Sequence, residues 1–392
     1  MKVLFLEWDG YGNKDILDAY KQLGHKVTTF PFSTAECRND PDYERSLTAE
    51  ISKQSPDYIF TFNHYPLVAK VCNQEGLPYI SWIYDSPFVP LYSYTTIFPC
   101  NYIFVFDKEF CYEFQKNGIQ TVHYLPMAAN TNRLDSMTNL SGFRNSPYVN
   151  KTDISFVGSL YTEEVRSRGF FKRFNLISPY TRGYLDGIMT AQKNVFGYNF
   201  IQELLTPDIM KDLQHSCPVE TNYDGVESAE YIYAQYFINR QITAIERSEI
   251  ISHITRYFPM DLYTSADDFT CDRLTLHGPI DPYNIAPYVY KCSKINLNMS
   301  LRSIKSGMPL RVFDIMGAGG FLLSNFQSDF LDYFVPGDDF AFYDSQKDLI
   351  SKIDYYLRND AERAQMAASA HRKIKNSHTF VHRIQEMESY LP

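Results

Sequence analysis

The first third of the chain alternates short β-rich runs with helix-like stretches, and this alternation limits the possible folds more than any other feature. Between the first two runs, Asn13–Leu23 repeats its apolar residues with a helical period, and Gly24 follows as a stop. Strands that alternate with helices through short connections form a parallel sheet covered on both faces. The sequence therefore predicts an open α/β domain over residues 1–145, with strands at Val3–Glu7, Lys26–Phe30, Asp57–Phe62, Tyr79–Ile83, Tyr102–Phe106 and Thr121–Leu125.

The same pattern returns after a polar stretch, Asn139–Thr152. A long segment with mostly helical periodicity follows its first strand, and helices are predicted at Pro309–Gly317 and Asp348–Leu357. We predict a second α/β domain over 151–377 with a helical insertion at 162–254, closed by a C-terminal helix over 378–392. The strands expected in this domain are Asp153–Val157, Met260–Tyr263, Arg273–His277, Lys294–Asn298 and Gly320–Ser324.

Charge and length exclude several classes of protein. The 392 residues suit two or three domains, and a net charge of −9 disfavours binding to nucleic acid or to an anionic membrane. The N-terminal apolar run is too short for a signal peptide, and no stretch is long enough for a membrane span. Seven scattered cysteines without a C-x-x-C spacing indicate reduced thiols and a cytoplasmic location.

Common cofactor motifs are absent or incomplete. The turn Gly10-Tyr11-Gly12 follows the first strand, but the third glycine of a dinucleotide fingerprint is replaced by Asp15, so NAD is not expected. We interpret this turn as a loop that lines a ligand cleft. The sequence contains no phosphate-binding P-loop, and Asp40-Pro41-Asp42 indicates a turn at the start of a helix, so no metal site is predicted.

The stretch from Lys294 to Asp339 carries the strongest chemical signal. A strand runs into a loop with Arg302, Lys305 and Arg311, and a glycine-rich turn follows, with Gly317, Gly319 and Gly320. Cations beside a helix start are suited to bind a diphosphate, because backbone N–H groups and positive charges converge there. The alternative is that these are solvated loop charges and ordinary turn glycines.

This stretch, LNMSLRSIKSGMPLRVFDIMGAGGFLLSN, resembles the CgeB-like (spore-maturation protein) group of GT-B glycosyltransferases. The segments PDYIFTFN, YISWIYDSP, YIFVFDK, YLPMAAN, ISFVGSLY and HTFVHRI are also similar to that group, so the resemblance spans nearly the whole chain. It implies two Rossmann-like domains facing a cleft, a nucleotide-sugar donor on the C-terminal domain, an acceptor on the N-terminal one, and catalysis without a metal or other cofactor.

The resemblance also implies roles for individual residues. Related enzymes carry two glutamates with seven residues between them, of which the second holds the ribose; here these positions are Ser306 and Asp314. The glycine turn at 317–320 would lie near the donor, as would the loop Gly158-Ser159. His277, at a strand end, would lie near the base. Gly158 as a tight turn and His277 as a satisfied edge histidine are the alternatives.

Two residues are candidates for a catalytic base on the acceptor side. Asp85 in WIYDSP and His64 in TFNHYP both follow predicted strands, where a side chain can point toward a ligand. A carboxylate or imidazole there can take the proton from an acceptor hydroxyl. Capping of a turn is the alternative for Asp85, and a retaining reaction needs neither residue as a base.

We therefore expect a glycosyltransferase that moves a sugar from a nucleotide-diphosphate donor to a glycan, a protein or another hydroxyl acceptor. A nucleotide-sugar epimerase or hydrolase shares this fold, and a two-lobed binding protein without catalysis is a third interpretation. The insertion, rich in Tyr and Phe, suits an acceptor groove or a contact in a homo-oligomer.

Overall fold

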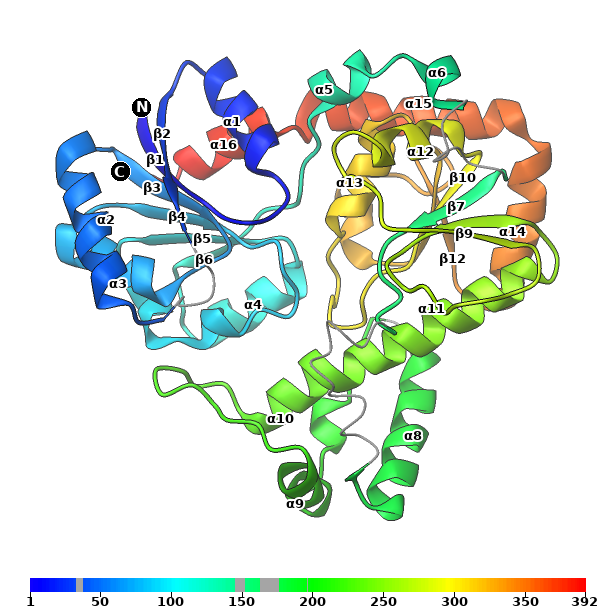
Figure 1. Cartoon of the computed structure of the whole chain (residues 1–392), viewed down its shortest axis with the longest axis horizontal. Helices are drawn as coiled ribbons and strands as arrows, with labels where there is room; N and C mark the ends of the chain where they lie inside the picture. Colours follow the sequence, from blue (N-terminus) through cyan, green and yellow to red (C-terminus); the bar gives the residue numbers. More distant parts are fainter. Residues whose placement is uncertain (33–37, 145–151, 163–175, 196) are drawn as a thin grey trace. The chain divides into compact units, whose positions relative to one another are not determined.

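A computed structural model describes residues 1–32, 38–144, 152–162, 176–195 and 197–392. The chain divides into two compact units, each built on a six-stranded parallel sheet (Figure 1). The first unit contains Met1–Asn130, Thr221–Glu227 and Asn376–Pro392, and the second contains Thr131–Glu220 and Ser228–Lys375. The two parallel sheets confirm the predicted α/β fold class.

The sheet of the first unit has the strand order β2-β1-β3-β4-β5-β6. Its central strands β3 and β4 are buried along their whole length, as expected for strands covered by helices on both faces. The strand order reverses between β1 and β3, and the turn after β1 begins at this point of the sheet. All six predicted strands are confirmed: β1 (Lys2–Glu7), β2 (Lys26–Pro31), β3 (Tyr58–Phe62), β4 (Tyr79–Trp82), β5 (Asn101–Val105) and β6 (Val122–Tyr124).

The helices of the first unit begin where the sequence signals them. Asp40 caps α2, and its carboxylate accepts hydrogen bonds from the backbone N–H groups of Asp42 and Tyr43, so this motif is a helix start. The C-terminal α16 packs on α1, and its Glu388 accepts a hydrogen bond of 2.7 Å from the Tyr58 hydroxyl. The elements are α1 (Asn13–Gln22), α2 (Pro41–Gln54), α3 (Pro66–Glu75), η2 (Val89–Tyr92), η3 (Tyr94–Ile97), α4 (Lys108–Lys116) and α16 (Phe380–Glu388).

The sheet of the second unit has the order β12-β11-β10-β7-β8-β9, so β7 and β10 lie side by side at its centre. This is the Rossmann order, and the point where it reverses lies between β7 and β10. The five predicted strands are confirmed, and β12 was missed because three residues give no periodic pattern. The strands are β7 (Ile154–Val157), β8 (Met260–Tyr263), β9 (Leu274–His277), β10 (Ile295–Asn298), β11 (Leu322–Asn325) and β12 (Ala341–Tyr343).

Helices cover this second sheet. Ser345 caps α14, and its hydroxyl accepts from the backbone N–H of Asp348. The sheet core is apolar, with Phe156, Leu262, Leu297 and Leu323 fully or almost fully buried. The helices are α5 (Thr131–Ser136), α6 (Leu140–Arg144), α12 (Ala286–Cys292), α13 (Leu310–Gly317), α14 (Gln346–Arg358) and α15 (Asp360–Ser377).

The described part of the predicted insertion is helical. It has its own apolar core, in which Leu185, Leu213, Tyr233 and Ile242 are fully buried. In Figure 1, α8 and α9 lie beyond α11, away from the sheet of this unit. The elements are α8 (Pro179–Lys193), η5 (Gln202–Leu204), α9 (Pro207–Ser216), α10 (Ala229–Ile232), the π-helical η6 (Tyr233–Ile238) and α11 (Asn239–Thr255); residues 163–175 of the insertion lie outside the described ones.

The units differ from the predicted domain boundaries at two places. The first unit ends at Asn130 and not near residue 145, and Lys291 ties α5 to the second unit by donating to the carbonyls of Leu134 and Met137. Residues 221–227 leave the insertion and pack in the first unit, where buried Asp224 forms an ion pair with Arg38. Short polar segments carry no periodicity, so only long-range contacts decide which unit they join. Among the described helices, none combines the length and the apolar character needed to cross a membrane.

Candidate functional site

The carboxyl ends of β7 and β10 meet at the point where the strand order of the second sheet reverses. Open α/β sheets bind ligands at this place, because the loops after the two strands separate there. Gly158 and Ser159 follow β7, and the loop 299–309 connects β10 to α13. This edge of the second unit is the candidate donor site.

Arg311 lies in the first turn of α13 and points into this site. Its Nη1 donates a hydrogen bond of 3.0 Å to Oδ1 of Asn298, and its guanidinium lies over the ring of Phe156 at 4.8 Å. Burial lowers the pKa of Arg311. A side chain at Gly158 would need the same space, since a Cβ there would lie 2.4 Å from Nη2 of Arg311. A side chain at position 158 would therefore displace the guanidinium of Arg311 from its present place.

Arg247, on α11, is a second buried cation at this edge, and the sequence analysis missed it. Its guanidinium donates to the carbonyls of Ser159 and Met299 and lies 5.3 Å from the centre of the Phe156 ring. The side chain is 3% exposed, and burial, together with the smaller effect of the Arg311 charge, lowers its pKa to about 10. Nothing in the local sequence distinguishes Arg247 from an ordinary helix arginine, so only the fold identifies it.

The two arginines place two desolvated positive charges on one aromatic ring. In the described part of the chain, neither forms an ion pair with a carboxylate, and Nε of Arg247 has no hydrogen-bond partner. Buried charges are normally paired, because desolvation of an unpaired charge is costly. Two buried guanidinium groups without an ion pair in the described residues, at the edge where such sheets bind ligands, are therefore suited to bind an anion, and a diphosphate carries enough charge for both.

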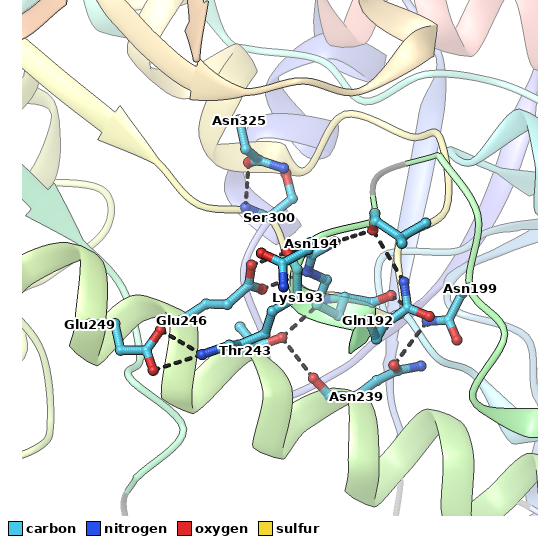
Figure 2. Close-up of polar contacts among 12 residues, drawn as sticks. Gln192, Lys193, Asn194, Asn199, Asn239, Thr243, Glu246, Glu249, Ser300 and Asn325 are labelled. Atoms are coloured by element: carbon cyan, nitrogen blue, oxygen red, sulfur yellow. Dashed lines mark hydrogen bonds and ion pairs between the residues drawn. The ribbon is translucent and has the colours of Figure 1, made fainter. Parts of the chain in front are cut away.

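A small cavity of about 30 Å³ adjoins Arg247. This volume holds about one water molecule. Several of its polar side chains appear in Figure 2, where the backbone N–H of Ser300 donates to Oδ1 of Asn325 at 2.8 Å. The cavity is lined by Thr243, Glu246, Arg247, Ile250, Met299, Ser300, Arg302, Asn325 and Tyr343.

Arg302, expected to bind phosphate, has other partners. Its guanidinium forms a two-pronged ion pair with Glu246 and also donates to the carbonyls of Lys193 and Val195. With these bonds, its donors are used inside the protein, so the prediction that Arg302 binds the diphosphate is wrong in this structure. Lys305 is half-buried and Ser306 is buried in the same loop.

The glycine-rich turn lies at the opposite edge of the sheet from the arginines. The chain of α13 runs from the carboxyl end of β10 back to the start of β11, and its eight residues span about 12 Å. Gly320 packs against the first half of β10, since a Cβ there would lie 2.8 Å from Nδ2 of Asn296. Gly317 and Gly319 belong to the same turn. The expectation that the turn at 317–320 lies near the donor is therefore wrong, because a parallel crossover has to return to the amino edge.

Asp314 lies one turn after the start of α13 and is half-buried. Its charge acts on two neighbours: it opposes the burial that lowers the pKa of Arg311, and it adds to the burial that raises the pKa of Tyr290. Asp314 thus stands close to the arginine site, and its role in holding a ribose stays a prediction.

His277 ends β9, the edge strand of the sheet, and is held by its own unit. Its Nε2 lies 2.7 Å from Oδ1 of Asp261, and its ring stacks on Tyr263 at 4.3 Å. The other oxygen of Asp261 accepts from Thr152. These contacts agree with the alternative of a satisfied edge histidine, and proximity to a base stays a prediction.

In the first unit, the turn after β1 packs on aromatic rings. Gly12 has φ of +106°, and a Cβ there would lie 2.8 Å from the ring of Phe62. Gly10 is exposed, and the ring of Trp8 leaves no space for a Cβ at position 10. Tyr11, between the two glycines in the sequence, is half-buried. Close packing explains both glycines, and the contact of this turn with a ligand stays a prediction.

Asp85 lies at the carboxyl edge of the first sheet and is exposed. Nδ2 of Asn63 donates to its carboxylate at 2.9 Å, and Oδ1 of Asn63 accepts from the backbone N–H groups of Tyr84 and Asp85. Asn63 has φ of 60°, a conformation that asparagine tolerates better than most residues. The carboxylate of Asp85 is therefore held in a defined place at the edge where ligands bind.

His64 is not at that edge. Its side chain is fully buried, its Nδ1 lies 3.2 Å from the Ser81 hydroxyl, and its ring stacks on Tyr79. Burial lowers its pKa to about 3. The prediction that His64 serves as a base is wrong, because a buried ring cannot reach an acceptor hydroxyl.

Three or more carboxylate, imidazole or thiol side chains do not come together as a metal-binding group anywhere in the described residues. Metal-independent catalysis stays a prediction.

Comparisons with known proteins agree with this geometry. Residues 247–389 match a family model described as glycosyl transferase-like, a stretch that begins at Arg247 and includes Arg311. No curated protein matches the chain. Similar solved structures include a glycosyltransferase from Rickettsia africae, with a TM-score of 0.56, 10% identity, and 99% of this chain and 98% of that chain covered.

Two further structures extend the comparison. Anabaena HepE, solved in complex with UDP and glucose, has a TM-score of 0.55 and 11% identity, and the match covers 100% of each chain. Sucrose-phosphate synthase from Thermosynechococcus elongatus has a TM-score of 0.53 and 11% identity, with 100% of this chain and 98% of that chain covered. The fold of the chain is that of the GT-B glycosyltransferases, and residues 247–389 carry the glycosyl transferase-like sequence.

Proposed function

We propose that this GT-B protein transfers a sugar from a nucleotide-diphosphate donor to a hydroxyl acceptor, which is a glycan, a protein or a smaller molecule, without a metal ion. The observation that carries the proposal is the pair Arg247 and Arg311. Both guanidinium groups lie over Phe156 at the carboxyl edge of the second sheet. The family match over this part of the chain and the fold support the same reading.

The arginines would stabilise the leaving group. When the bond between sugar and diphosphate breaks, negative charge develops on the diphosphate, and preorganised positive charges in a dry site lower the energy of that state. The arginines are buried before any ligand arrives, so little reorganisation is needed. Asp314, near Arg311, would accept hydrogen bonds from the ribose hydroxyls.

On the first unit, Asp85 is the proposed base for the acceptor. Its carboxylate is exposed and fixed by Asn63. A carboxylate that accepts the hydroxyl proton during attack contributes roughly 10²–10⁴-fold in rate. We expect Asp85→Asn to lose transfer activity by that order while its affinity for UDP stays unchanged. Unchanged activity would assign to Asp85 the capping role only.

The donor site can be tested with UDP, the nucleotide bound in the HepE structure. Calorimetric titration should show that UDP binds at least tenfold more tightly than uridine, and Arg311→Lys should reduce this ratio, because an ammonium cannot reproduce the fork of a guanidinium. Arg358→Lys, at an exposed surface pair, is the matched control. Equal affinities for UDP and uridine in the natural protein would contradict a diphosphate site.

Metal independence is tested separately. Two cations already neutralise the diphosphate in this proposal, so activity should survive excess EDTA. Complete loss of transfer on chelation, with recovery on addition of a divalent ion, would overturn this part of the proposal.

Product analysis separates the proposal from its alternatives. Transfer needs a second substrate, whereas a nucleotide-sugar epimerase or hydrolase converts the donor alone, and a binding protein leaves it intact. A cytoplasmic location is also proposed: the six cysteines that the structure describes are unpaired, as expected in a reducing compartment.

A further inference from the structure

The loop after β10 is held by the helical insertion. Residue 302 of this loop is fixed at three points by side chains of the insertion, which are Asn199, Thr243 and Glu246. Its backbone N–H donates to Oγ1 of Thr243 at 3.0 Å, its carbonyl accepts from Nδ2 of Asn199 at 3.1 Å, and its side chain pairs with Glu246. The position of this loop is therefore set from outside the sheet.

The ion pair at the centre of this attachment is largely removed from water. The side chain of Arg302 is 11% exposed and that of Glu246 is 17% exposed. The guanidinium also donates to the carbonyls of Lys193 and Val195, at the end of α8, at 2.8 and 2.9 Å. A two-pronged pair with little exposure holds its geometry well, because its planar fork fits the carboxylate in one orientation.

Glu246 and Arg247 are neighbours on α11, and both hold the candidate donor site. Arg247 binds the carbonyls of Ser159 and Met299, at the ends of β7 and β10, while Glu246 holds Arg302 three residues further along the loop. One turn of α11 thus fixes both loops that surround the site. The cavity beside Arg247 is lined by Glu246, Met299 and Arg302 among others.

We propose that Glu246 and Arg302 are positioning residues, through which the helical insertion holds the loop after β10 in its ligand-binding shape. The inference extends the proposed function, because it assigns to the insertion control over donor affinity. Arg302 then acts on the donor without touching it, and the loop residues 303–309 and the start of α13, with Arg311, follow its position.

Hydrogen exchange of the ligand-free protein tests the positioning without depending on the donor. Glu246→Gln removes the charge of the carboxylate and one acceptor from the fork. We expect backbone amides of residues 300–305 to exchange about tenfold faster, while amides of α8 and α11 keep their natural rates.

A matched control lies one turn away on the same helix. Glu249 binds Nζ of Lys193 at 2.7 Å and so joins α11 to α8, but it makes no contact with the loop after β10 in the described structure (Figure 2). Glu249→Gln should leave exchange at 300–305 unchanged. If both variants loosen the loop equally, or if Glu246→Gln loosens α8 and α11 to the same extent as the loop, the pair is a structural link of the insertion and the inference is wrong.

The effect on the ligand is measured with UDP. Glu246→Gln should raise its dissociation constant about tenfold, and Glu249→Gln should not change it. Arg302→Lys, which keeps the charge and loses the fork, provides a second variant and should also weaken UDP. If the loop loosens without any change in UDP affinity, the inference that the insertion controls donor affinity is wrong. Failure of the natural protein to bind UDP or any other nucleoside diphosphate would contradict the proposed function, while the exchange result would still decide the positioning.

Discussion

A Cβ atom on Gly158 would lie 2.4 Å from Nη2 of Arg311. The residue after β7 and the arginine on α13 therefore compete for one space, although more than a hundred positions separate them in the sequence. The glycine allows the guanidinium to settle against Phe156 and to face the carboxyl edge of the sheet. The absence of a side chain at position 158 is thus linked directly to the position of the Arg311 charge.

Replacement of Gly158 by Ala should weaken UDP binding about tenfold or more, because the methyl group displaces the Arg311 guanidinium. Overpacking of this kind also costs about 1–3 kcal/mol of stability. Gly319→Ala is the control, since Gly319 has φ of +78°, lies in open space and belongs to the amino edge. It should lose about 1 kcal/mol of stability from backbone strain with no loss of affinity. Titration calorimetry and thermal melting measure both effects, and UDP affinity retained in Gly158→Ala would contradict the shared space.

Arg247→Met should separate stability from binding. Burial lowers the pKa of Arg247 to about 10, a shift that corresponds to about 3 kcal/mol of lost stability at every pH below that value. The substitution removes this penalty but leaves the carbonyls of Ser159 and Met299 without their donor, which costs a similar amount.

We therefore expect the free energy of unfolding of Arg247→Met to stay within about 1–2 kcal/mol of the natural value, while UDP binding falls more than tenfold. Urea denaturation and calorimetry decide the matter. Loss of stability with normal UDP affinity would assign Arg247 to the core.

His64 should make the protein sensitive to acid. Its pKa is lowered to about 3 by burial, whereas in the unfolded chain it is near 6.5. Below pH 6.5 the unfolded chain therefore binds a proton at His64 and the folded protein does not. The free energy of unfolding falls by about 1.4 kcal/mol per pH unit from pH 6.5 downward. The side chain in His64→Gln does not titrate. The free energy of unfolding of the variant, relative to that of the natural protein, should therefore rise at this rate as the pH falls from 6.5 to 4. A difference that does not vary with pH would disprove the assignment, and loss of transfer activity in the folded variant would restore the catalytic role.

Asp314→Asn tests the proposed ribose contact. The substitution keeps the shape and loses the charge, so it should weaken UDP by about 1–3 kcal/mol, the scale of hydrogen bonds to charged groups. If Asp314 only supports Arg311, the ligand-free protein should melt earlier and affinity per folded molecule should stay near normal. Parallel melting and titration separate the two roles, and a lower melting temperature with unchanged affinity would exclude the ribose contact.

The local pattern of the sequence was sufficient for the strands and most of the helices. Period-2 and period-3.6 repeats arise within one element and need no information from elsewhere, so β1 to β11 and α13 could be read directly from the residues. Residue chemistry also predicted Arg311 as a donor-binding residue, because it stands at a helix start after a strand, and this role stays a prediction. The same reasoning failed for the turn at 317–320, since it ignored the direction in which a parallel crossover runs.

The tertiary structure decided which charged groups pair with a carboxylate inside the protein and which do not. Arg302 and Arg247 look alike in the sequence. Arg302 forms an ion pair with Glu246, whereas Arg247 forms no ion pair within the described chain. His64 and Asp85 both follow strands, but one ring turns into the core and the other side chain stays at the edge. These differences depend on partners many residues away. The sequence thus determined the elements and the chemistry available, whereas long-range packing selected the residues that form the site.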